Sequence, residues 1–377
     1  MLEQTEWSEH ELGDLFEKLT LKFNKKPFDK INDISKDQNK EFDLPLVNAK
    51  FGDNGIMYYG RSSDFDSVEM TIDIVNDGAI STGKVYPQPQ RTGVLYNAYL
   101  IKPKNVVTRN QLIFFSKCIE KSIQLKYGYE NKAGWEKVKK EKIKLPQKEG
   151  KIDYQFMENF IAELEQARIA ELEAYLIATG LNDYILTNKE CAVLEAFRQD
   201  KKIQWLEFNI GQLFDILTYK KRFDANKVEV LDAGHPYVVR TALNNGVKGY
   251  LLEDEQYLND GNTISFGQDT ATMFYQEKPY FTGDKIKIVK SKFEGFNKII
   301  AMYFITTMGK AFSNFSWGSS SFSVKSIESQ KIMLPSKDGI PDFEFMMTFI
   351  SAIQKLVIKD VVLYADAKIE ATKKVVN

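Results

Sequence analysis

The clearest pattern of apolar and polar positions in this chain occurs twice, each time directly after an Asp. After Asp153, apolar residues recur at steps of three and four: Phe160, Leu164, Ala167, Ala170, Ala174, Ile177 and Leu181. After Asp342, the same spacing runs through Met346, Ile350, Ile353, Val357, Val361, Tyr364 and Ala367. The spacing predicts two amphipathic helices of about 25–30 residues, and Asp is a good N-cap for each.

These two helices are expected to pair with each other. A helix of roughly 40 Å with an apolar seam usually packs on another like it. The alternative is that each helix packs on its own half of the chain. Pairing is the preferred hypothesis, because each helix is too long for a globule of roughly 150 residues to cover. In an antiparallel pair, the chain order globule–helix–globule–helix would hold two globules at opposite ends, with approximate twofold symmetry.

The segments before the helices have a different pattern, with short apolar runs separated by Gly, Pro and Asn-Gly. Thr71–Val75 and residues 97–102 resemble strands, and residues 111–125 and 296–309 resemble short buried helices. Asn54-Gly55 and Asn245-Gly246 lie between β-prone residues and indicate hairpin turns. Trp7, Phe16, Trp205 and Phe214 are assigned to the core.

The chain contains an internal duplication, because four segments recur in the same order. The matching pairs are 7–20 with 205–218, 44–56 with 235–247, 142–146 with 331–335, and 153–161 with 342–350. The offset falls from 198 to 189 residues, so loop lengths differ while the order of elements is kept. The predicted fold class is therefore α+β, with two similar mixed globules held apart by two long antiparallel helices. The expected boundaries are 1–152, 153–200, 201–341 and 342–377.

Charge is distributed unevenly along the chain, although the formal net charge is only −1. Residues 84–151 carry 16 Lys and Arg against 5 Asp and Glu, and aromatic residues lie among them. Such a stretch is typical of a surface that meets phosphates. The second half lacks a comparable stretch, and a solvated Lys-rich surface is the alternative interpretation.

Motifs for catalysis are missing from the sequence. No Pro-Pro occurs, so the loop with which adenine methyltransferases grip a flipped base is absent, and so is a phosphate-binding Gly-rich loop. Two cysteines and two histidines have no metal-ligand spacing. We therefore expect no enzymatic activity, no cofactor and no metal. The few cysteines, the polar N-terminus and the lack of a long apolar run predict a cytoplasmic protein without a membrane association.

Donor and aromatic side chains near the Asn-Gly turns are the candidates for contact with DNA. Asn and Gln suit adenine, Arg and Lys suit guanine, and lysines further on suit phosphates. In the first half the candidates are Lys50, Asn54, Tyr58, Arg61, Thr82, Lys84, Tyr86, Gln88, Gln90, Arg91, Lys126, Lys132, Lys137 and Lys139. In the second half they are Arg240, Asn244, Asn245, Lys248, Tyr250, Gln268, Thr272 and Tyr275. For each of them, an ordinary surface-loop residue is the alternative.

These motifs resemble a known family. The Trp-x4-Leu-Gly-x-Leu-Phe opening at Trp7, the Asp-Tyr/Phe-x-Phe-Met-x-x-Phe-Ile junctions at 153–161 and 342–350, and the duplication resemble the specificity subunits of Type I restriction–modification enzymes. The segment from Pro45 to Ile56 is similar to versions in Type IIB-like systems. The resemblance implies two target-recognition domains that each read part of a bipartite double-stranded DNA site. It implies methyltransferase subunits carrying S-adenosylmethionine as partners, and it leaves a restriction subunit open as a further partner.

Two other functions remain open from the sequence. The chain could act alone as a DNA-binding regulator, in which case no methyltransferase would copurify with it. It could also be a scaffold whose paired helices bind only protein. The basic stretch at 84–151 favours DNA binding over the scaffold.

Overall fold

The structure is a computed structural model that describes residues 5–25, 27–199, 203–313 and 322–376, with side chains as far as residue 371. Contacts between residues divide the chain into two compact units, Met1–Glu171 and Leu172–Asn377. The predicted domain boundaries at 152/153 and 341/342 fall within the described residues, and the one at 200/201 lies outside them. All of these boundaries stay a prediction.

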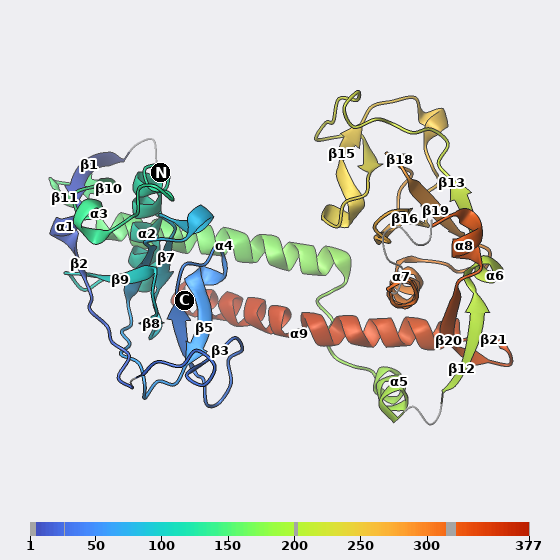
Figure 1. Ribbon diagram of the computed structural model, residues 1–377, viewed down its shortest axis with the longest axis horizontal. Coiled ribbons are helices and arrows are strands. Elements are labelled where there is room, and N and C mark those ends of the chain that lie inside the picture. The colour runs from blue at the N-terminus through green and yellow to red at the C-terminus, as the bar shows by residue number, and fades with distance from the viewer. Residues whose placement is uncertain (1–4, 26, 200–202, 314–321, 377) are drawn as a thin grey trace. The chain divides into compact units, whose positions relative to one another are not determined.

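The described residues of the first unit form three antiparallel or mixed sheets (Figure 1). The first sheet has the order β1 (Glu6–Glu11), β10 (Lys142–Lys148), β11 (Lys151–Ile152). The second has the order β2 (Phe16–Lys18), β9 (Ala98–Pro103), β6 (Thr71–Val75), β7 (Val85–Gln88). The third has the order β3 (Ile34–Ser35), β5 (Ile56–Gly60), β4 (Leu44–Val47), β8 (Gly93–Val94). The helices are α1 (Leu12–Leu15), α2 (Arg109–Ile123), α3 (Trp135–Val138) and the start of α4 (Tyr154–Thr179).

The second unit repeats this plan with the same strand order, except that the third sheet has no described strand equivalent to β3. Its first sheet has the order β12 (Gln204–Asn209), β20 (Lys331–Lys337), β21 (Ile340–Pro341). Its second has the order β13 (Phe214–Thr218), β19 (Ile286–Ser291), β16 (Thr263–Gly267), β17 (Met273–Gln276). Its third has the order β15 (Val247–Leu251), β14 (His235–Val238), β18 (Phe281–Thr282). Its helices are α5 (Asn188–Gln199), α6 (Ile210–Leu213), α7 (Lys298–Phe312), α8 (Val324–Glu328) and α9 (Phe343–Val376). The duplication read from the sequence is therefore a duplication of structure, and the predicted α+β class is confirmed.

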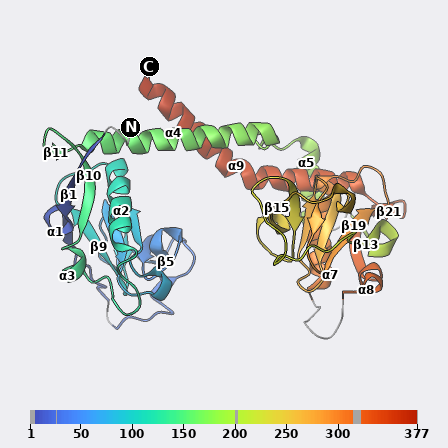
Figure 2. The ribbon, with the colours of Figure 1, turned by 90° about the horizontal axis from the view of Figure 1, so that it is seen from above.

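Local sequence explains why the helix beside each larger sheet forms. Thr108 caps α2 in a capping box with Gln111, and the apolar residues Leu112, Phe115 and Ile119 are buried. This apolar side lies along the sheet of the first unit (Figure 2). Asn297 caps α7 in the equivalent place by accepting hydrogen bonds from two main-chain amides. The predicted strand Thr71–Val75 and both short helices are confirmed, with shifts of a few residues at their ends.

The core assignments are correct for the two phenylalanines and wrong for one tryptophan. Phe16 and Phe214 are buried, each beside a helix phenylalanine. Trp205 is half-buried, and Trp7 is 38% exposed. Trp7 lies on the edge strand β1, and the ring of Phe156 packs edge-on against it at 6.2 Å. Trp205 lies on the equivalent edge strand β12, where Phe197 of α5 also packs against it, at 6.2 Å, so the edge position alone does not account for the exposure of Trp7.

Both long helices begin where the sequence predicts. Asp153 accepts a hydrogen bond from the Phe156 amide, and Asp342 accepts one from the Phe345 amide, each at 2.9 Å. The helices contain 26 and 34 residues. These carboxylates satisfy amides of the first turn and oppose the positive end of the helix dipole.

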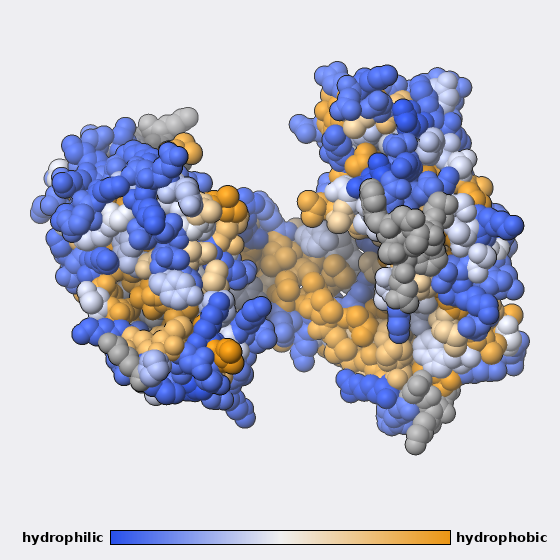
Figure 3. Space-filling model, in the orientation of Figure 1, coloured by the Kyte–Doolittle hydropathy of each residue, from blue (hydrophilic) through white to orange (hydrophobic). Residues whose placement is uncertain are grey.

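The predicted seam of the long helices is correct only in part: Met346 is fully buried and Leu181 packs in the cluster between the two helices, but other seam residues are exposed. Within the second unit, Leu172 and Leu176 of α4 pack with Ile358, Val362 and Ala365 of α9. The predicted seam residues Ile177, Val357 and Tyr364 are exposed instead. Apolar residues occupy most sides of α9, so spacing alone did not single out the buried one. Figure 3 shows apolar surface where α9 runs in Figure 1. The exposed large apolar or aromatic side chains in this part of α9 are Ile353, Leu356, Val357, Val361, Leu363 and Tyr364.

Within the described residues, a buried carboxyl group that has no hydrogen-bond partner distinguishes the first unit from the second. Among the described residues, the buried side-chain atoms without a hydrogen-bond partner belong to Thr71, Asp73 and Asn76. The residue of β16 equivalent to Asp73 is Ser265, whose hydroxyl donates to the Phe274 carbonyl and accepts from Gln276. Burial raises the pKa of the Asp73 carboxyl well above its ordinary value.

We expect Asp73→Asn to stabilise the protein increasingly as the pH rises. Because the folded state holds the Asp73 proton more tightly than the unfolded state does, the wild type loses stability as the pH rises through the raised pKa. The isosteric amide cannot ionise, so at neutral pH it should gain about 1–3 kcal/mol. Melting temperatures measured from pH 4 to pH 8 test this. Asp37→Asn, at an exposed position, is the control, and parallel pH curves for wild type and Asp73→Asn would contradict the expectation.

Candidate DNA interface

The Asn-Gly turns have the same backbone conformation in both units. Asn54 and Asn245 have φ of 53° and 54°, and Gly55 and Gly246 have φ of 76° and 77°. Each turn joins two antiparallel strands, β4 to β5 and β14 to β15, as the sequence predicts. At Gly55 a side chain would also overlap Asp73 and Tyr86, so glycine is required there by space as well as by φ.

A pair of amide side chains fixes each turn to the neighbouring sheet. Asn54 Nδ2 donates to the Pro87 carbonyl at 2.8 Å, and Gln88 Nε2 donates back to the Asn54 carbonyl at 2.7 Å. In the second unit, Asn245 Nδ2 donates to the Tyr275 carbonyl, and Gln276 Nε2 donates to the Asn245 carbonyl, both at 3.0 Å. Gln88 and Gln276 are buried. Asn54, Gln88 and Asn245 were predicted to touch DNA, and the structure gives their polar groups partners within the protein.

Several predicted residues of the first unit gather beside its turn. The Tyr86 hydroxyl accepts a hydrogen bond from the Gly52 amide at 2.9 Å and donates to the Lys50 carbonyl at 3.3 Å. The Lys50 ammonium lies 2.6 Å from Asp53. Lys84 lies 5.2 Å from the centre of the exposed Phe51 ring and 3.3 Å from Glu120. The turn therefore carries two cations and two aromatic rings on one surface.

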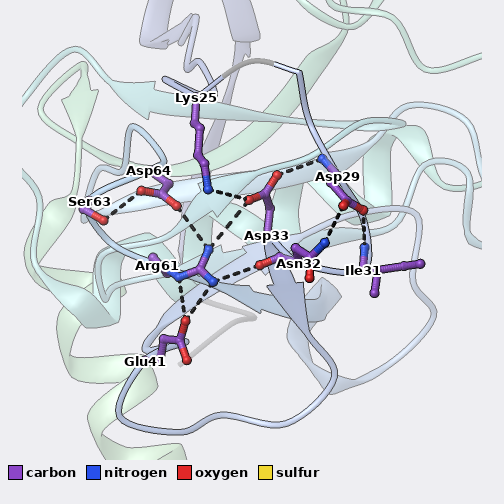
Figure 4. A network of polar contacts seen from close by, with 9 residues as sticks. All are labelled: Lys25, Asp29, Ile31, Asn32, Asp33, Glu41, Arg61, Ser63 and Asp64. Atoms are coloured by element: carbon purple, nitrogen blue, oxygen red, sulfur yellow. Dashed lines mark hydrogen bonds and ion pairs between the residues drawn. The ribbon is translucent and has the colours of Figure 1, made fainter.

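Arg61 lies at the far end of β5 and is bound within the protein (Figure 4). Its guanidinium donates to Glu41 at 2.7 and 2.9 Å, to Asp64 at 3.3 Å and to the Asn32 carbonyl at 2.9 Å. It also stacks at 4.5 Å over the Phe42 ring. The hydrogen bond with Glu41 is the main reason why the pKa of Arg61 is raised. This network fixes residues 29–43 to the strand, and little of the guanidinium is left to meet a base.

Other candidates of the first unit divide into buried and exposed groups. Thr82 is buried, and its hydroxyl accepts from the Gly78 amide at 3.0 Å. Tyr58 is half-buried beside Lys30. Gln90 and Arg91 are exposed just after β7, where Arg91 donates to Ser67 at 3.1 Å. Arg91 thus has far fewer internal bonds than Arg61.

The predicted phosphate-binding lysines, of which Lys139 is half-buried and the others are exposed, are paired with nearby acceptors. Lys126 pairs with Glu141, Lys132 with Asp77, and Lys139 with Glu136, while Lys137 donates to Asn131 at 2.8 Å. One of these partners, Asp77, lies outside the basic stretch, so its pairing with Lys132 reduces the positive charge that the linear sequence shows there. Exposed pairs contribute little, about 0–1 kcal/mol, so phosphates can replace these carboxylates at low cost.

In the second unit, three of the predicted residues gather beside Gly267. Arg240 pairs with Asp269 and approaches Asp284. The Thr272 hydroxyl bonds to Thr270 at 2.8 Å, and Gln268 is half-buried next to them. Two carboxylates therefore hold Arg240 in place, as carboxylates do for Arg61.

The remaining candidates of the second unit lie at the turn or on its strands. Asn244 bonds within the turn to the Val247 carbonyl at 3.0 Å, and the Tyr275 hydroxyl donates to Asn262 at 2.9 Å. Lys248 is exposed, and the described residues give its ammonium no bond. Tyr250 lies on β15, where its main chain pairs with that of Leu231.

The sequence reasoning missed a basic loop that follows the first strand of the larger sheet in each unit. In the first unit this loop carries Lys22, Lys25 and Lys30, and in the second it carries Lys220, Lys221, Arg222 and Lys227. Each loop is anchored by one phenylalanine, Phe23 or Phe223, in the core of the small sheet. The signal in the sequence is a cation directly before each phenylalanine, at Lys22-Phe23 and Arg222-Phe223, which are 200 residues apart instead of the 198 that separate 7–20 from 205–218.

The described part of the chain holds no group of three or more His, Cys, Asp or Glu side chains able to bind a metal ion. Likewise, none of its helices is long and apolar enough to cross a membrane.

Comparison with known proteins gives a match to a family model in both units. The model described as "Type I restriction modification DNA specificity domain" matches residues 4–174 and again residues 202–362. These two matches cover most of the chain and coincide with the internal duplication.

A curated relative and a solved structure agree with this match. The specificity subunit S.BcgI of a Type II restriction enzyme from Heyndrickxia coagulans is 34% identical over 155 residues, which are 40% of this chain and 44% of that protein. The chain thus matches less than half of that relative. The crystal structure of a Type I restriction–modification S subunit from M. genitalium has a TM-score of 0.60 at 16% identity, over 99% of this chain and 94% of that one. This likeness shows a shared fold. The chain therefore belongs to the family of Type I restriction–modification DNA specificity domains, of which it carries two copies.

Proposed function

We propose that this chain is a non-catalytic subunit that directs methyltransferase subunits to a bipartite double-stranded DNA site. In this proposal, residues 1–152 and 201–341 are target-recognition domains, and residues 153–200 and 342–377 are helical spacers. The methyltransferase subunits would supply S-adenosylmethionine, and a restriction subunit would be a further partner. The compartment proposed for this assembly is the cytoplasm.

One observation carries the proposal: the same turn is held by the same amide pair in both units, while the side chains around it differ. Lys50, Phe51 and Tyr86 flank the first turn, whereas Asn244, Lys248 and Tyr275 flank the second. A common support with different exposed side chains is suited to reading two different base sequences. It is less suited to a protein scaffold, which has no need of two matched turns.

The proposed contacts fall into two classes. Side chains at the turns and after β7, such as Lys50, Arg91 and Lys248, would meet base edges. The lysines Lys126, Lys132, Lys137 and Lys139, together with the basic loops at Lys22 and Lys220, would meet phosphates. Thr82, Gln88 and Arg61 would act indirectly, by holding these surfaces in shape.

The function is tested by mapping methylated bases in a host that expresses the chain with its neighbouring methyltransferase. We expect a split motif, with a gap of fixed length, that appears only when both proteins are present. Exchanging residues 1–152 for those of a relative should then change one half of that motif. An unchanged motif without this chain would contradict the proposal and leave a lone DNA binder or a scaffold.

Arg91→Ala should change DNA binding, whereas Arg61→Ala should change thermal stability. Arg91 is exposed, and within the described residues its guanidinium donates one hydrogen bond, to Ser67, so its loss should weaken DNA binding by the complex severalfold and leave the melting temperature unchanged. Arg61 holds residues 29–43, so its loss should lower the melting temperature by a few degrees. Binding titrations at fixed salt, with thermal melts beside them, measure both. A melting temperature that falls equally in the two variants would show that Arg91 is structural.

Gln88→Met and Gln276→Met should each damage recognition of one half of the site only. Methionine keeps the length of the side chain but removes the donor to the Asn54 or Asn245 carbonyl. A buried hydrogen bond contributes about 1 kcal/mol, so discrimination should drop by roughly fivefold to tenfold at that half-site. Selection of duplexes from a randomised library by the complex measures this. If either variant relaxed both half-sites equally, the turns would not be separate reading elements.

A further inference from the structure

Helix α5 covers an aromatic face of the second unit. This face consists of Trp205 on β12 with Phe345 and Phe349 on α9. Phe197 of α5 lies 6.2 Å from the Trp205 ring and 4.4 Å from the Phe349 ring. A cavity of about 260 Å³ remains between α5 and the strand residues beneath it.

The same aromatic face exists in the first unit. Trp7, Phe156 and Phe160 are the equivalents of Trp205, Phe345 and Phe349, because β1 and α4 repeat β12 and α9. The strand registers agree too, since Trp7 lies opposite Pro146 as Trp205 lies opposite Pro335. Phe156 and Phe160 stack at 5.9 Å.

No helix within the described residues of the first unit takes the place of α5. Trp7 is 38% exposed, although tryptophan is a large apolar side chain on a well-formed strand. Phe114 of α2 supports Phe156 and Phe160 from the core side, so the rings are held rigidly. The face is thus preformed, and it matches a surface that a helix covers elsewhere in the same chain.

Charge indicates which helix could cover it. In the second unit, Glu190 of α5 is buried and accepts hydrogen bonds from Ser351 at 2.7 Å, from Lys355 at 3.2 Å and from Thr187. Although burial acts in the opposite direction, these bonds lower the pKa of Glu190 to about 2. The equivalents of Ser351 and Lys355 in the first unit are Ala162 and Gln166. A second copy of α5 placed there would bury its carboxylate without a cation, which is strongly unfavourable.

We propose that Trp7, Phe156 and Phe160 form the docking site for an amphipathic helix of the methyltransferase subunit. This inference rests on the proposed function. The helix would present an apolar side chain where α5 has Phe197, and a neutral side chain where α5 has Glu190. Docking of partners on the two units would then be unequal, because the equivalent face of the second unit is already covered.

The test uses the full chain with its neighbouring methyltransferase. Trp7→Glu should weaken the complex at least tenfold, while Leu125→Glu, at a residue that is 97% exposed in the same unit, should leave it unchanged. In a second measurement, benzoylphenylalanine replaces Gln166, which is exposed and leaves the rings intact. On illumination it should crosslink to a helix of the methyltransferase.

Each outcome decides the matter. Equal affinity for Trp7→Glu and wild type, or a crosslink from position 166 to a second copy of this chain, would overturn the inference while leaving the proposed function in place. Failure of the wild-type chain to bind the methyltransferase at all would overturn the proposed function itself. If Trp7→Glu does not fold, the crosslink alone decides, and its absence from the methyltransferase counts against the docking site.

Discussion

Pairing of the first strand of each unit with its last long strand is the constraint on which the rest of the structure depends. β1 pairs with β10 from Glu6 to Glu11, and β12 pairs with β20 in the same register. Each pair joins segments that are more than 120 residues apart in sequence, and it closes the unit around its core. The long helix starts from this pair, since the amides of Asp153 and Asp342 donate to the carbonyls of Pro146 and Pro335 at 2.8 Å. In each unit the pairing of the first and last long strands, the start of the long helix and the aromatic face with its tryptophan are therefore all formed at the same place.

A second constraint acts at the opposite side of each unit, where buried amides support an exposed turn. Gln88 and Gln276 bind main-chain carbonyls, so the turn does not depend on which side chains surround it. This separation allows the surface to vary without loss of the fold. It also explains why an arginine such as Arg61 can be mistaken for a reading residue: acidic neighbours that are distant in sequence decide its role.

The fold was predictable from sequence wherever a local signal determines it. Helix caps at Asp153 and Asp342, the Asn-Gly turns and the duplication all depend on neighbouring residues or on repeated order. What could not be predicted depends on contacts between distant segments. The exposure of Trp7 and of Trp205 depends on which helix packs beside the strand, as α5 does at Trp205, and the buried side of α9 follows from what packs there rather than from spacing. Some lysines of 84–151 pair with carboxylates from outside this stretch, so the net positive charge of the folded surface is lower than the count along the sequence indicates.

Asp73 has a consequence for how selection acts on a duplicated chain. Both units follow one plan and share one host and one temperature, yet the first has an unpartnered buried carboxyl group where the second has a well-bonded serine. Selection removes an unfavourable residue only when the stability of the whole chain falls below what its function needs. Selection therefore acts on the stability of the whole chain, and one unit can carry an unfavourable residue that its twin does not have.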